Sequence, residues 1–498
     1  MTFRYWIDVD DDNQFSGTDE ITADVISAQW RIGLRNSLAR LADETQATLV
    51  VNNTDGKYAP ENPSSPLYGK LHPQKRLRIT HDDLPLWTGW LSTPQVGYVA
   101  SGGASGKTTV TFNAVGGKAL LEELPARLPL YSDVTAEQVL TEIFSTTLLP
   151  PAIADVWRLG DVAMSFVDET TRLGSIADFA ELDAGKFRFQ IFGDVAYDDL
   201  WSAIHHLVVA ERGHFFFRRD GRAVFWNRHR LHQPYTPVAT VTSDNEYAPQ
   251  AVMYRYGERL INEAWVECLP RQAQGEAVLW ALDSPLTLAP NQQITLEARL
   301  RRAGGQSVGA DDTLYAIADF AQGNASIRIT PLGGKALINI TNTNRTTILN
   351  SLNLNGKSNA RQNALAVIAK DADSQAQYGR YGTKIRIPAP ANPLEIQSIA
   401  QYEVLAGAHP SGVVERLRYI QSAIATPPQP LAWTVGSVLH ISLPELYHQA
   451  DYIVIGEQHR IEGTVHQTEY ILAKMPMRLW VLGETDEASL GGMTKLGY

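Results

Sequence analysis

The chain has 498 residues, of which 44% are hydrophobic, and this length provides for about three domains with cores of their own. A single cysteine, Cys268, excludes an intrachain disulfide and any zinc site built on paired thiolates. The 54 acidic and 43 basic residues give a net charge of −11, which argues against sequence-independent binding to duplex DNA. A negative surface is nevertheless compatible with lining a conduit for DNA, because it would repel phosphates.

The hydropathy pattern argues against a membrane protein. No window reaches the roughly 18 apolar residues of a membrane span. The amino terminus has acidic residues where a signal peptide needs an apolar run. We therefore expect a soluble protein made in the cytoplasm, with no membrane insertion.

The residues after the first predicted strand are acidic. Asp8, Asp10, Asp12 and Asp19 fall at positions 1, 3, 5 and 12 of a calcium-binding loop. Position 6, where the sharp turn needs glycine, is Asn13, and position 12 is a short aspartate where a bidentate glutamate is usual. We favour a solvated acidic hairpin over a bound cation, and we expect no metal and no other cofactor.

A long loop follows the predicted strand at 48–51. Its asparagines, glycines and prolines oppose both a helix and a sheet ladder. Apolar side chains in the loop are spaced so that they can fold back onto a sheet, and Gly69 would permit a close approach. The side chains expected to anchor the loop are Tyr58, Leu67, Tyr68 and Leu71.

The strands around this loop are predicted from alternation. In the strand at 76–80 the apolar Leu77 and Ile79 should face inward, and Arg76 and Arg78 outward. Similar patterns predict strands at 3–9, 21–32, 86–91 and 110–115.

Two glycine-containing stretches are predicted to be hairpin turns. Gly102 to Thr109 reads GGASGKTT and imitates a phosphate-binding loop, but the template demands a glycine where the chain has Ser101. A strand follows it, whereas a nucleotide site requires a helix whose amino end faces the phosphates. Asp220 and Gly221 form the second turn, between two strands within 214–226, because this dipeptide favours a tight hairpin.

Two amphipathic helices are predicted between these turns. Thr135 and Gln138 form a capping box before a helix that ends by Pro150. The second helix spans 197–212, with acidic residues in its first turn and Gly213 as its stop signal.

Three histidines and one glutamate near this second helix are candidate metal ligands: His205, His206, Glu211 and His214. At 100° per residue along a helix, Glu211 points away from His206, so the set does not share one face. The order HExxH is also absent. We expect capping and surface roles for these residues.

The second half of the chain is predicted to be a β-rich block, a helix and further strands. The block, 275–356, has the pattern of a small sandwich. Asn392 and Pro393 begin a helix that stops at Gly407. Strands are expected at 294–300, 326–329, 335–341 and 347–354 in the block, and at 414–420, 437–443, 452–457 and 465–475 after the helix.

Three stretches resemble the tail hub and baseplate hub proteins of tailed bacteriophages. The first is a strand followed by Asn-x-x-Asp-Gly-x-Tyr-x-Pro, Ser-Pro-Leu-Tyr-Gly, a basic strand and Trp-x-Gly. The second is a helix ending in Ala-Glu-x-Gly, an aromatic strand, Asp-Gly and a strand ending in Asn-Arg. The third is Tyr-Gly, a helix and strands containing Val-Gly, Ile-Val-Ile-Gly and His-Gln-Thr. The residues that carry them are Asn52, Asp55, Gly56, Tyr58, Pro60, Ser65, Pro66, Leu67, Tyr68, Gly69, Trp87 and Gly89; Ala210, Glu211, Gly213, Phe215, Phe216, Phe217, Asp220, Gly221, Phe225, Asn227 and Arg228; and Tyr378, Gly379, Val435, Gly436, Ile453, Val454, Ile455, Gly456, His466 and Thr468.

The resemblance implies a mainly β, multidomain protein with an α+β insertion and two related tube-type β-barrels. The block at 275–356 resembles the β-domain that is inserted in the same proteins. The domains expected are a first barrel at 1–118, an α+β domain at 119–234, a second barrel at 235–274 and 358–483, a β-sandwich at 275–357 and a flexible tail at 484–498.

The resemblance also implies a structural virion protein that is not an enzyme. Three copies would form a homotrimeric ring that joins the tail tube to the tail tip or baseplate. A tail tube or distal tail protein would lie above the ring, and a tail fibre, spike or tape-measure protein nearby. Viral DNA would pass through the ring during ejection without specific binding.

The sequence contains neither a dinucleotide fingerprint nor the order HExxH, and we predict no catalytic and no cofactor-binding residues. The paired carboxylates of a glycosidase are not recognisable in a sequence, because their separation exists only in the fold. The alternative hypothesis is a carbohydrate-binding or carbohydrate-degrading tail-tip module acting at the host surface, motivated by the 11 tryptophans and the sandwich. Core packing is the commoner use of tryptophan.

Overall fold

A computed structural model describes most of the chain. Within the described residues, no helix combines the length and the apolarity that a membrane crossing requires. The predicted hairpin tip at 102–106, Pro150, Asn392 and nearly all of the tail after 483 lie outside them. The described residues are 3–10, 15–37, 39–42, 45–82, 84–92, 95–99, 107–146, 180–233, 235–257, 260–310, 313–343, 345–389, 393–422, 429–475, 479–480 and 495–496.

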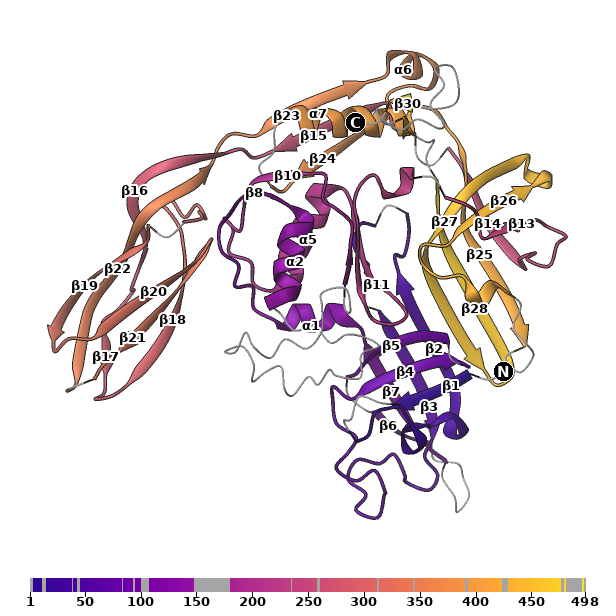
Figure 1. Cartoon of the computed structure of the whole chain (residues 1–498), viewed down its shortest axis with the longest axis horizontal. Helices are drawn as coiled ribbons and strands as arrows, with labels where there is room; N and C mark the ends of the chain where they lie inside the picture. The colour runs from indigo at the N-terminus through magenta and orange to yellow at the C-terminus, as the bar shows by residue number, and fades with distance from the viewer. Residues whose placement is uncertain are drawn as a thin grey trace.

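One sheet of 13 strands contains both the amino-terminal and the carboxy-terminal parts of the chain (Figure 1). Its strands are β1 (Phe3–Ile7), β2 (Val25–Gly33), β3 (Gln46–Asn52), β4 (Arg76–His81), β5 (Leu84–Leu91), β6 (Gln95–Val99), β7 (Lys107–Val115), β13 (Ala239–Val241), β14 (Ala251–Tyr256), β25 (Gly412–Ser422), β26 (Val438–Leu443), β27 (His448–Glu462) and β28 (Val465–Lys474). The hydrogen-bonded path runs β1-β4-β5-β7-β3-β2-β27-β28-β25-β14, with β6 beside β7, β26 beside β27, and β13 beside β26. Alternation predicted most of these strands, but it did not predict β6.

The apolar side of this sheet is buried in a core to which both parts contribute. Leu49 of β3 and Phe112 of β7 are fully buried cross-strand partners. Ile453 and Ile455 of β27 pack into the same cluster. Alternate residues share a face of a strand, so one apolar stripe per strand is enough to build this core.

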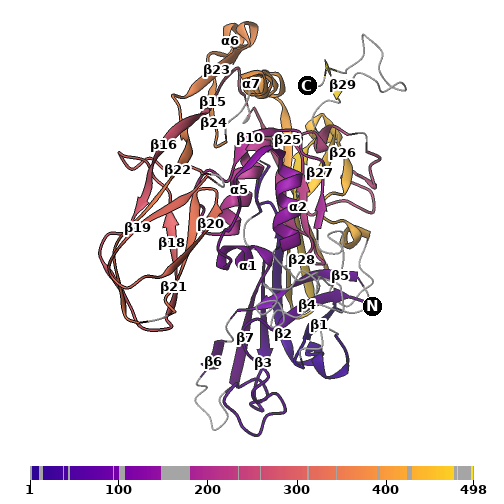
Figure 2. The ribbon, with the colours of Figure 1, turned by 60° about the vertical axis from the view of Figure 1, so that its left-hand side comes forward.

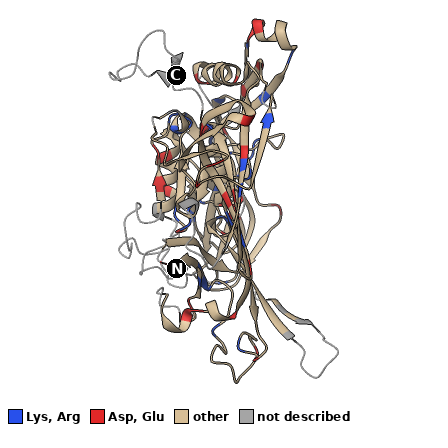
Figure 3. Ribbon diagram, turned by 90° about the vertical axis from the view of Figure 1, so that its right-hand side faces the viewer, with Lys and Arg blue, Asp and Glu red and all other residues tan. Residues whose placement is uncertain are grey.

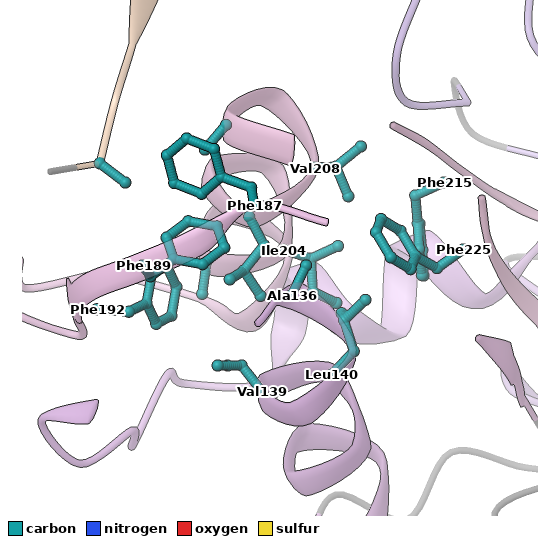
Figure 4. Close-up of a cluster of buried hydrophobic side chains, with 14 of the residues drawn as sticks. Ala136, Val139, Leu140, Phe187, Phe189, Phe192, Ile204, Val208, Phe215 and Phe225 are labelled. Atoms are coloured by element: carbon teal, nitrogen blue, oxygen red, sulfur yellow. The ribbon is translucent and has the colours of Figure 1, made fainter. Parts of the chain in front are cut away.

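The segment between the two parts of the large sheet is an α+β unit. Its elements are α1 (Gly117–Glu123), β8 (Tyr131–Thr135), α2 (Ala136–Thr146), β9 (Ala180–Leu182), β10 (Arg188–Phe192), α5 (Leu200–Glu211), β11 (His214–Phe217) and β12 (Ala223–Trp226). Val139 and Leu140 of α2 and Ile204 of α5 pack with Phe187 and Phe189, all without exposed surface (Figure 4). The helical faces predicted from periodicity are therefore the buried ones.

The ends of the two helices differ in detail from the prediction. The amide of Thr135 donates to Gln138 Oε1 at 2.9 Å, but Thr135 Oγ1 has no partner, so only half of the capping box forms. Asp199 is the N-cap of α5 and accepts from the amide of Ser202 at 2.7 Å. Arg212, with φ 60°, takes the left-handed position that ends α5, one residue before Gly213.

A three-stranded sheet with two helices lies beside the α+β unit. It consists of β23 (Leu365–Lys370), β15 (Glu263–Cys268) and β24 (Gly382–Ile387), with α6 (Ala372–Tyr378) and α7 (Pro393–Gly407). Ala264 and Val266 of β15 pack with Ile396 of α7 in the core that also contains α2 and α5. Residues 263–268 and 365–387, together with α7, were placed with the second barrel by the sequence but form a separate sheet with two helices. Alternation shows that a face is buried but not which element covers it.

The block predicted as a sandwich has two sheets around one apolar core, and it projects to the left in Figure 1. One sheet contains β16 (Arg271–Ala281), β17 (Leu286–Leu288), β19 (Tyr315–Gln322) and β22 (Thr347–Arg361), and the other contains β18 (Gln293–Arg299), β20 (Ser326–Leu332) and β21 (Lys335–Thr341). Ile338 and Ile340 face Leu352 and Leu354 across the core. Figure 2 shows the two layers from another side.

Backbone-to-backbone contact fixes this block to the α+β unit. The amide of Gly334 donates to Gly193 O at 2.7 Å. A Cβ on Gly309 or on Gly334 would overlap the connection between β10 and α5. Arg271 and Asp194 form a buried ion pair at the same contact. The block therefore meets the α+β unit through a contact that admits no side chain at these glycines.

Candidate functional site

The pairing of β2 with β27 joins the two parts of the large sheet, and we call it the seam. It runs from Ser27 opposite Glu462 to Gly33 opposite Gly456. Gly33 has φ +80°, and a Cβ on Gly456 would overlap Leu34 O. The seam thus ends at a close backbone approach that requires glycine.

Across the seam, one side of the sheet faces solvent and is polar. The aligned rows cross β25, β28, β27, β2, β3 and β7 in that order. We call these residues the open face: Ile420, Gln467, Arg460, Gln29, Thr48 and Asn113 in one row, and Arg418, Glu469, Gln458, Arg31, Gln46 and Val115 in the next.

The open face is not acidic, although the chain as a whole is. Amides and hydroxyls occupy half of the positions, and Glu469 pairs with both Arg416 and Arg418. Arg460 pairs with Glu462. Basic and acidic residues are interspersed along the ribbon (Figure 3). The negative conduit surface considered from composition is therefore not found on this face.

On the buried side of the sheet, an arginine from the α+β unit reaches the seam. The Asp220-Gly221 signal predicted a turn between β11 and β12, and the structure has this turn. Arg219 lies in it. Its Nε donates to Glu457 Oε1 at 2.7 Å, and further N–H groups donate to the carbonyls of Leu431 at 3.0 Å and Trp433 at 2.6 Å. A buried bidentate ion pair thus connects the hairpin to β27.

A hydrogen-bonded chain continues from Glu457 along the buried side. Gln421 Nε2, which can only donate, lies 3.2 Å from His466 Nδ1. His466 Nε2 is then the donor to His459 Nδ1 at 3.1 Å, and His459 Nε2 donates to Glu457 at 3.2 Å. Both histidines are satisfied as neutral rings. We call Trp30, Arg219, Glu457, His459 and His466 the junction cluster.

Burial and charge together set the protonation of this cluster. Burial, followed by the charges of His459, His81 and Arg219, lowers the pKa of His466 to about 2. Burial raises the pKa of Glu457, but the guanidinium of Arg219 and the hydrogen bonds outweigh it and hold the pKa at about 2. Burial also lowers the pKa of His459. The cluster therefore holds one charged pair and two neutral imidazoles. Its role is structural, since it joins the α+β unit to the seam.

Sequence reasoning did not select Arg219, Glu457 or His459. The signal was present in the alternation of β27, where Glu457 and His459 occupy positions of the buried side. A polar residue at such a position needs a partner inside the protein. His466 entered only as part of a family resemblance.

The acidic residues near the amino terminus gather as the calcium-loop template suggested, and Asp8 and Asp19 are buried, whereas Asp10 is exposed to solvent. Ligand atoms of Asp8, Asp10 and Asp19 lie within 4.8 Å of one another, and two of the three side chains are buried. Asp19 accepts from the amides of Val9 and Ser16, both at 3.0 Å. Asp12 and Asn13 lie outside the described residues. The carboxylate of Asp19 therefore serves the backbone turn.

The four candidate metal ligands around α5 do not form a group among the described residues. His206 Nδ1 lies 2.7 Å from the hydroxyl of Tyr197. Glu211 is buried and accepts from the amide of Phe187 at 2.7 Å, and burial raises its pKa. Burial also lowers the pKa of His214. Glu211 and His214 are thus buried rather than on the surface, and Glu211 binds backbone amides of the segment before β10.

The proline-containing loop at 53–75 folds back as predicted. Tyr58, Leu67 and Leu71 are buried, and the hydroxyl of Tyr58 donates to Asp24 at 2.5 Å. Tyr68 is instead 55% exposed. A Cβ on Gly69 would meet nothing within 4 Å, so its role is the φ of +72° rather than a close approach.

One inward-outward assignment beside the loop is wrong. Leu77 and Ile79 are buried as expected, but Arg76 is buried too. The guanidinium groups of Arg76 and Arg78 lie over the ring of Phe15, at 5.5 and 4.2 Å from its centroid. Aromatic packing thus covers a position that alternation assigned to solvent.

Comparisons with known proteins give structural but no sequence matches. No protein-family model and no curated protein matches the chain. The tail protein of Neisseria meningitidis MC58 is 10% identical with a TM-score of 0.49, over 95% of this chain and 97% of that one. The 43 kDa tail protein of prophage MuSo2 from Shewanella oneidensis is 9% identical with a TM-score of 0.49, over 95% and 98%. A type VI secretion component of E. coli, itself similar to the bacteriophage T4 tail proteins gp27 and gp5, is 9% identical with a TM-score of 0.36, over 91% and 73%. The chain is thus similar in structure, over most of its length, to phage tail proteins.

Proposed function

We propose that the chain is a structural protein of a phage tail, a hub whose copies close into a ring with the open face turned toward the axis. The observation that carries the proposal is the seam. Three strands on one side of it, β2, β3 and β7, and three on the other, β27, β28 and β25, form one polar surface. Three copies would then supply six such segments of wall. We assign β1 to β7 to one barrel, and β13, β14 and β25 to β28 to the other.

The chemistry of the open face suits a channel through which DNA passes. Binding of a duplex depends on cations that replace the counterions of phosphates. Glu469 pairs with Arg416 and Arg418, and Glu462 pairs with Arg460. A surface of amides and hydroxyls, with Arg416, Arg418 and Arg460 held in ion pairs, would therefore let DNA slide without holding it. In the virion, the ring would meet a tail tube or distal tail protein above and a fibre, spike or tape-measure protein nearby.

Mass determination and imaging of the purified chain test the ring. Light scattering over a range of protein concentrations should give the mass of three copies, and cryo-electron microscopy should show an axial opening lined by β2 and β27. A monomer at the highest concentration, or a trimer with the open face on its outside, would contradict the proposal.

A second candidate is recognition of a carbohydrate, and one depression favours it. Tyr197, Trp201, Ser202, His205 and His206 line an open hollow beside α5, with aromatic and hydrogen-bonding groups together. The tryptophans Trp30, Trp87, Trp90, Trp226 and Trp433, by contrast, are buried in cores. A glycan array separates the two functions. Glycan binding that Trp201→Ala abolishes would support carbohydrate recognition, and the absence of glycan binding would support the structural role.

A further inference from the structure

One face of the β23-β15-β24 sheet carries exposed apolar side chains. α7 covers the opposite face, where Ala264 and Val266 are buried. On the exposed face Trp265 and Ile368 are direct cross-strand partners, 39% and 45% exposed. The indole Nε1 of Trp265 donates to Glu263 at 2.5 Å, which fixes the ring on the surface. An exposed tryptophan beside an exposed isoleucine indicates a contact surface.

Cations surround this apolar pair. Arg380 pairs with Glu263, and Lys384 and Arg386 pair with Glu267. Lys370 lies opposite Glu263 on β23. Four cations thus accompany two carboxylates, on a chain whose net charge is −11. We call this surface the Trp265 face: Trp265, Ile368, Lys370, Arg380, Lys384 and Arg386.

A second exposed feature, which we call the Tyr447 knob, consists of Leu446, the last residue of the short 3-10 helix Pro444–Leu446, and Tyr447, which follows it. The side chain of Tyr447 is 99% exposed and that of Leu446 is 42% exposed. The backbone of Tyr447 is left-handed, with φ 50° and ψ 37°, and its amide donates to Pro444 O at 3.0 Å. Tyrosine rarely adopts this conformation, and such strain concentrates at functional positions.

Only acidic charges lie on the chain segments that form and neighbour the knob. Glu445, Asp244 and Glu246 are exposed there, and Glu445 lies close enough to Ser243 and Asp244 to interact with both. Neither 239–250 nor 433–449 contains a lysine or an arginine. The knob is therefore an aromatic and acidic surface, complementary in charge to the aromatic and basic Trp265 face.

We propose that the Tyr447 knob of one copy docks on the Trp265 face of the next copy of this chain. The inference rests on the proposed ring, for which it supplies a contact between neighbours. The knob follows β26 at the right of Figure 1, and the face lies on β15 at the top of the picture, so the two belong to different parts of one copy. The contact is then heterologous and repeats from copy to copy, as a closed ring requires.

Directed cross-linking detects this contact even when it is short-lived. Tyr447→Cys protein is mixed with Ile368→Cys protein under mild oxidation, and the mixed disulfide dimer is quantified. The matched control replaces the second protein by Leu84→Cys, whose position on β5 is 40% exposed. We expect a several-fold excess of mixed dimer with Ile368→Cys. Equal yields with both partners would overturn the docking.

Self-association provides a second test that separates this inference from the ring itself. Loss of a buried aromatic anchor costs about 2 kcal/mol or more, so Tyr447→Ala should weaken association about 30-fold. Lys384→Glu with Arg386→Glu should weaken it too, and mixing that protein with one carrying Asp244→Lys and Glu445→Lys should restore it. If a trimer forms and none of these changes affects it, the ring is supported and the docking is overturned. If the wild-type chain does not associate and the cysteine variants do not cross-link, both the ring and the docking are overturned.

Discussion

Trp30 of β2 stacks on His459 of β27 across the seam, with ring centroids 4.8 Å apart and planes inclined by 10°. The two residues are direct cross-strand partners. Because His459 also bonds to Glu457, and Glu457 to Arg219, one line of contacts runs from the amino-terminal strands to the α+β unit. The position of three parts of the chain relative to one another therefore depends on buried polar groups.

Removing Arg219 should destabilise the protein strongly. Arg219→Ala leaves the Glu457 carboxylate buried without its countercharge, and breaking a buried pair in this way typically costs about 3–5 kcal/mol. Guanidinium unfolding followed by tryptophan fluorescence measures the change. The control is Arg188→Ala, whose ion pair with Asp133 is exposed and should matter little. Similar losses of unfolding free energy in the two variants would contradict the structural role of the Arg219–Glu457 pair.

Stability should fall on mild acidification because of His466. Its pKa is about 2 in the folded chain against 6.5 in the unfolded chain, so below pH 6.5 only the unfolded chain takes up the proton. The free energy of unfolding then drops by about 1.4 kcal/mol per pH unit as the pH falls from 6.5, and is unaffected by this group above 6.5. The pKa of Glu457, about 2 against 4.5, adds a loss of the same sign below pH 4.5.

Denaturation curves at a series of pH values measure this dependence. His466→Asn should flatten the slope between about pH 6.5 and pH 5, since asparagine does not titrate. His72→Asn, at an exposed site, should leave the slope unchanged. Because burial also lowers the pKa of His459 and of His214, part of the slope should remain, and a slope in His466→Asn as steep as that of the wild type would contradict the prediction.

The end of the seam should not tolerate a methyl group. In Gly456→Ala the added Cβ overlaps Leu34 O, a backbone atom that cannot move without opening the strand pair, and overpacking of this kind costs about 1–3 kcal/mol. Thermal unfolding reports the loss as a lower melting temperature. At Gly275 of β16 a Cβ would meet nothing within 4 Å, so Gly275→Ala should be neutral.

New cations on the open face should create DNA binding. On the wild-type face Glu469 pairs with Arg416 and Arg418 and Glu462 pairs with Arg460, so we expect no retention of duplex DNA at physiological salt. Replacing Gln29, Thr48 and Gln467 by lysine adds three unpaired cations in one row, and binding should appear and weaken steeply with salt. Fluorescence anisotropy with a labelled duplex measures both. Tight binding of the duplex by the wild-type chain would contradict the proposal that DNA slides along the open face.

Local signals in the sequence predicted much of the fold. The dipeptide Asp220-Gly221 turns the β11–β12 hairpin, Glu462-Gly463 turns β27 into β28, and Pro393 begins α7. These signals succeed because turn geometry and helix starts depend on a few neighbouring residues. They cannot report which strands meet across hundreds of residues, and so neither the seam nor the separate sheet of β15 was foreseen.

The junction cluster shows why a structural site is harder to predict than an enzyme motif. Arg219 and Glu457 are 238 positions apart in the sequence, and each has an ordinary local context. Only the fold makes them partners. Tyr447 was missed for a different reason, because neither its exposure nor its left-handed backbone follows from the residue type.

The glycines between the sandwich block and the α+β unit bear on how this chain can diverge. Gly309 and Gly334 meet the other unit through bare backbone, so replacement by any larger residue would push the two units apart. The outward strands of the block carry no such restriction. We therefore expect the surface residues of the sandwich block to differ widely among related chains, while the angle between the block and the α+β unit stays the same.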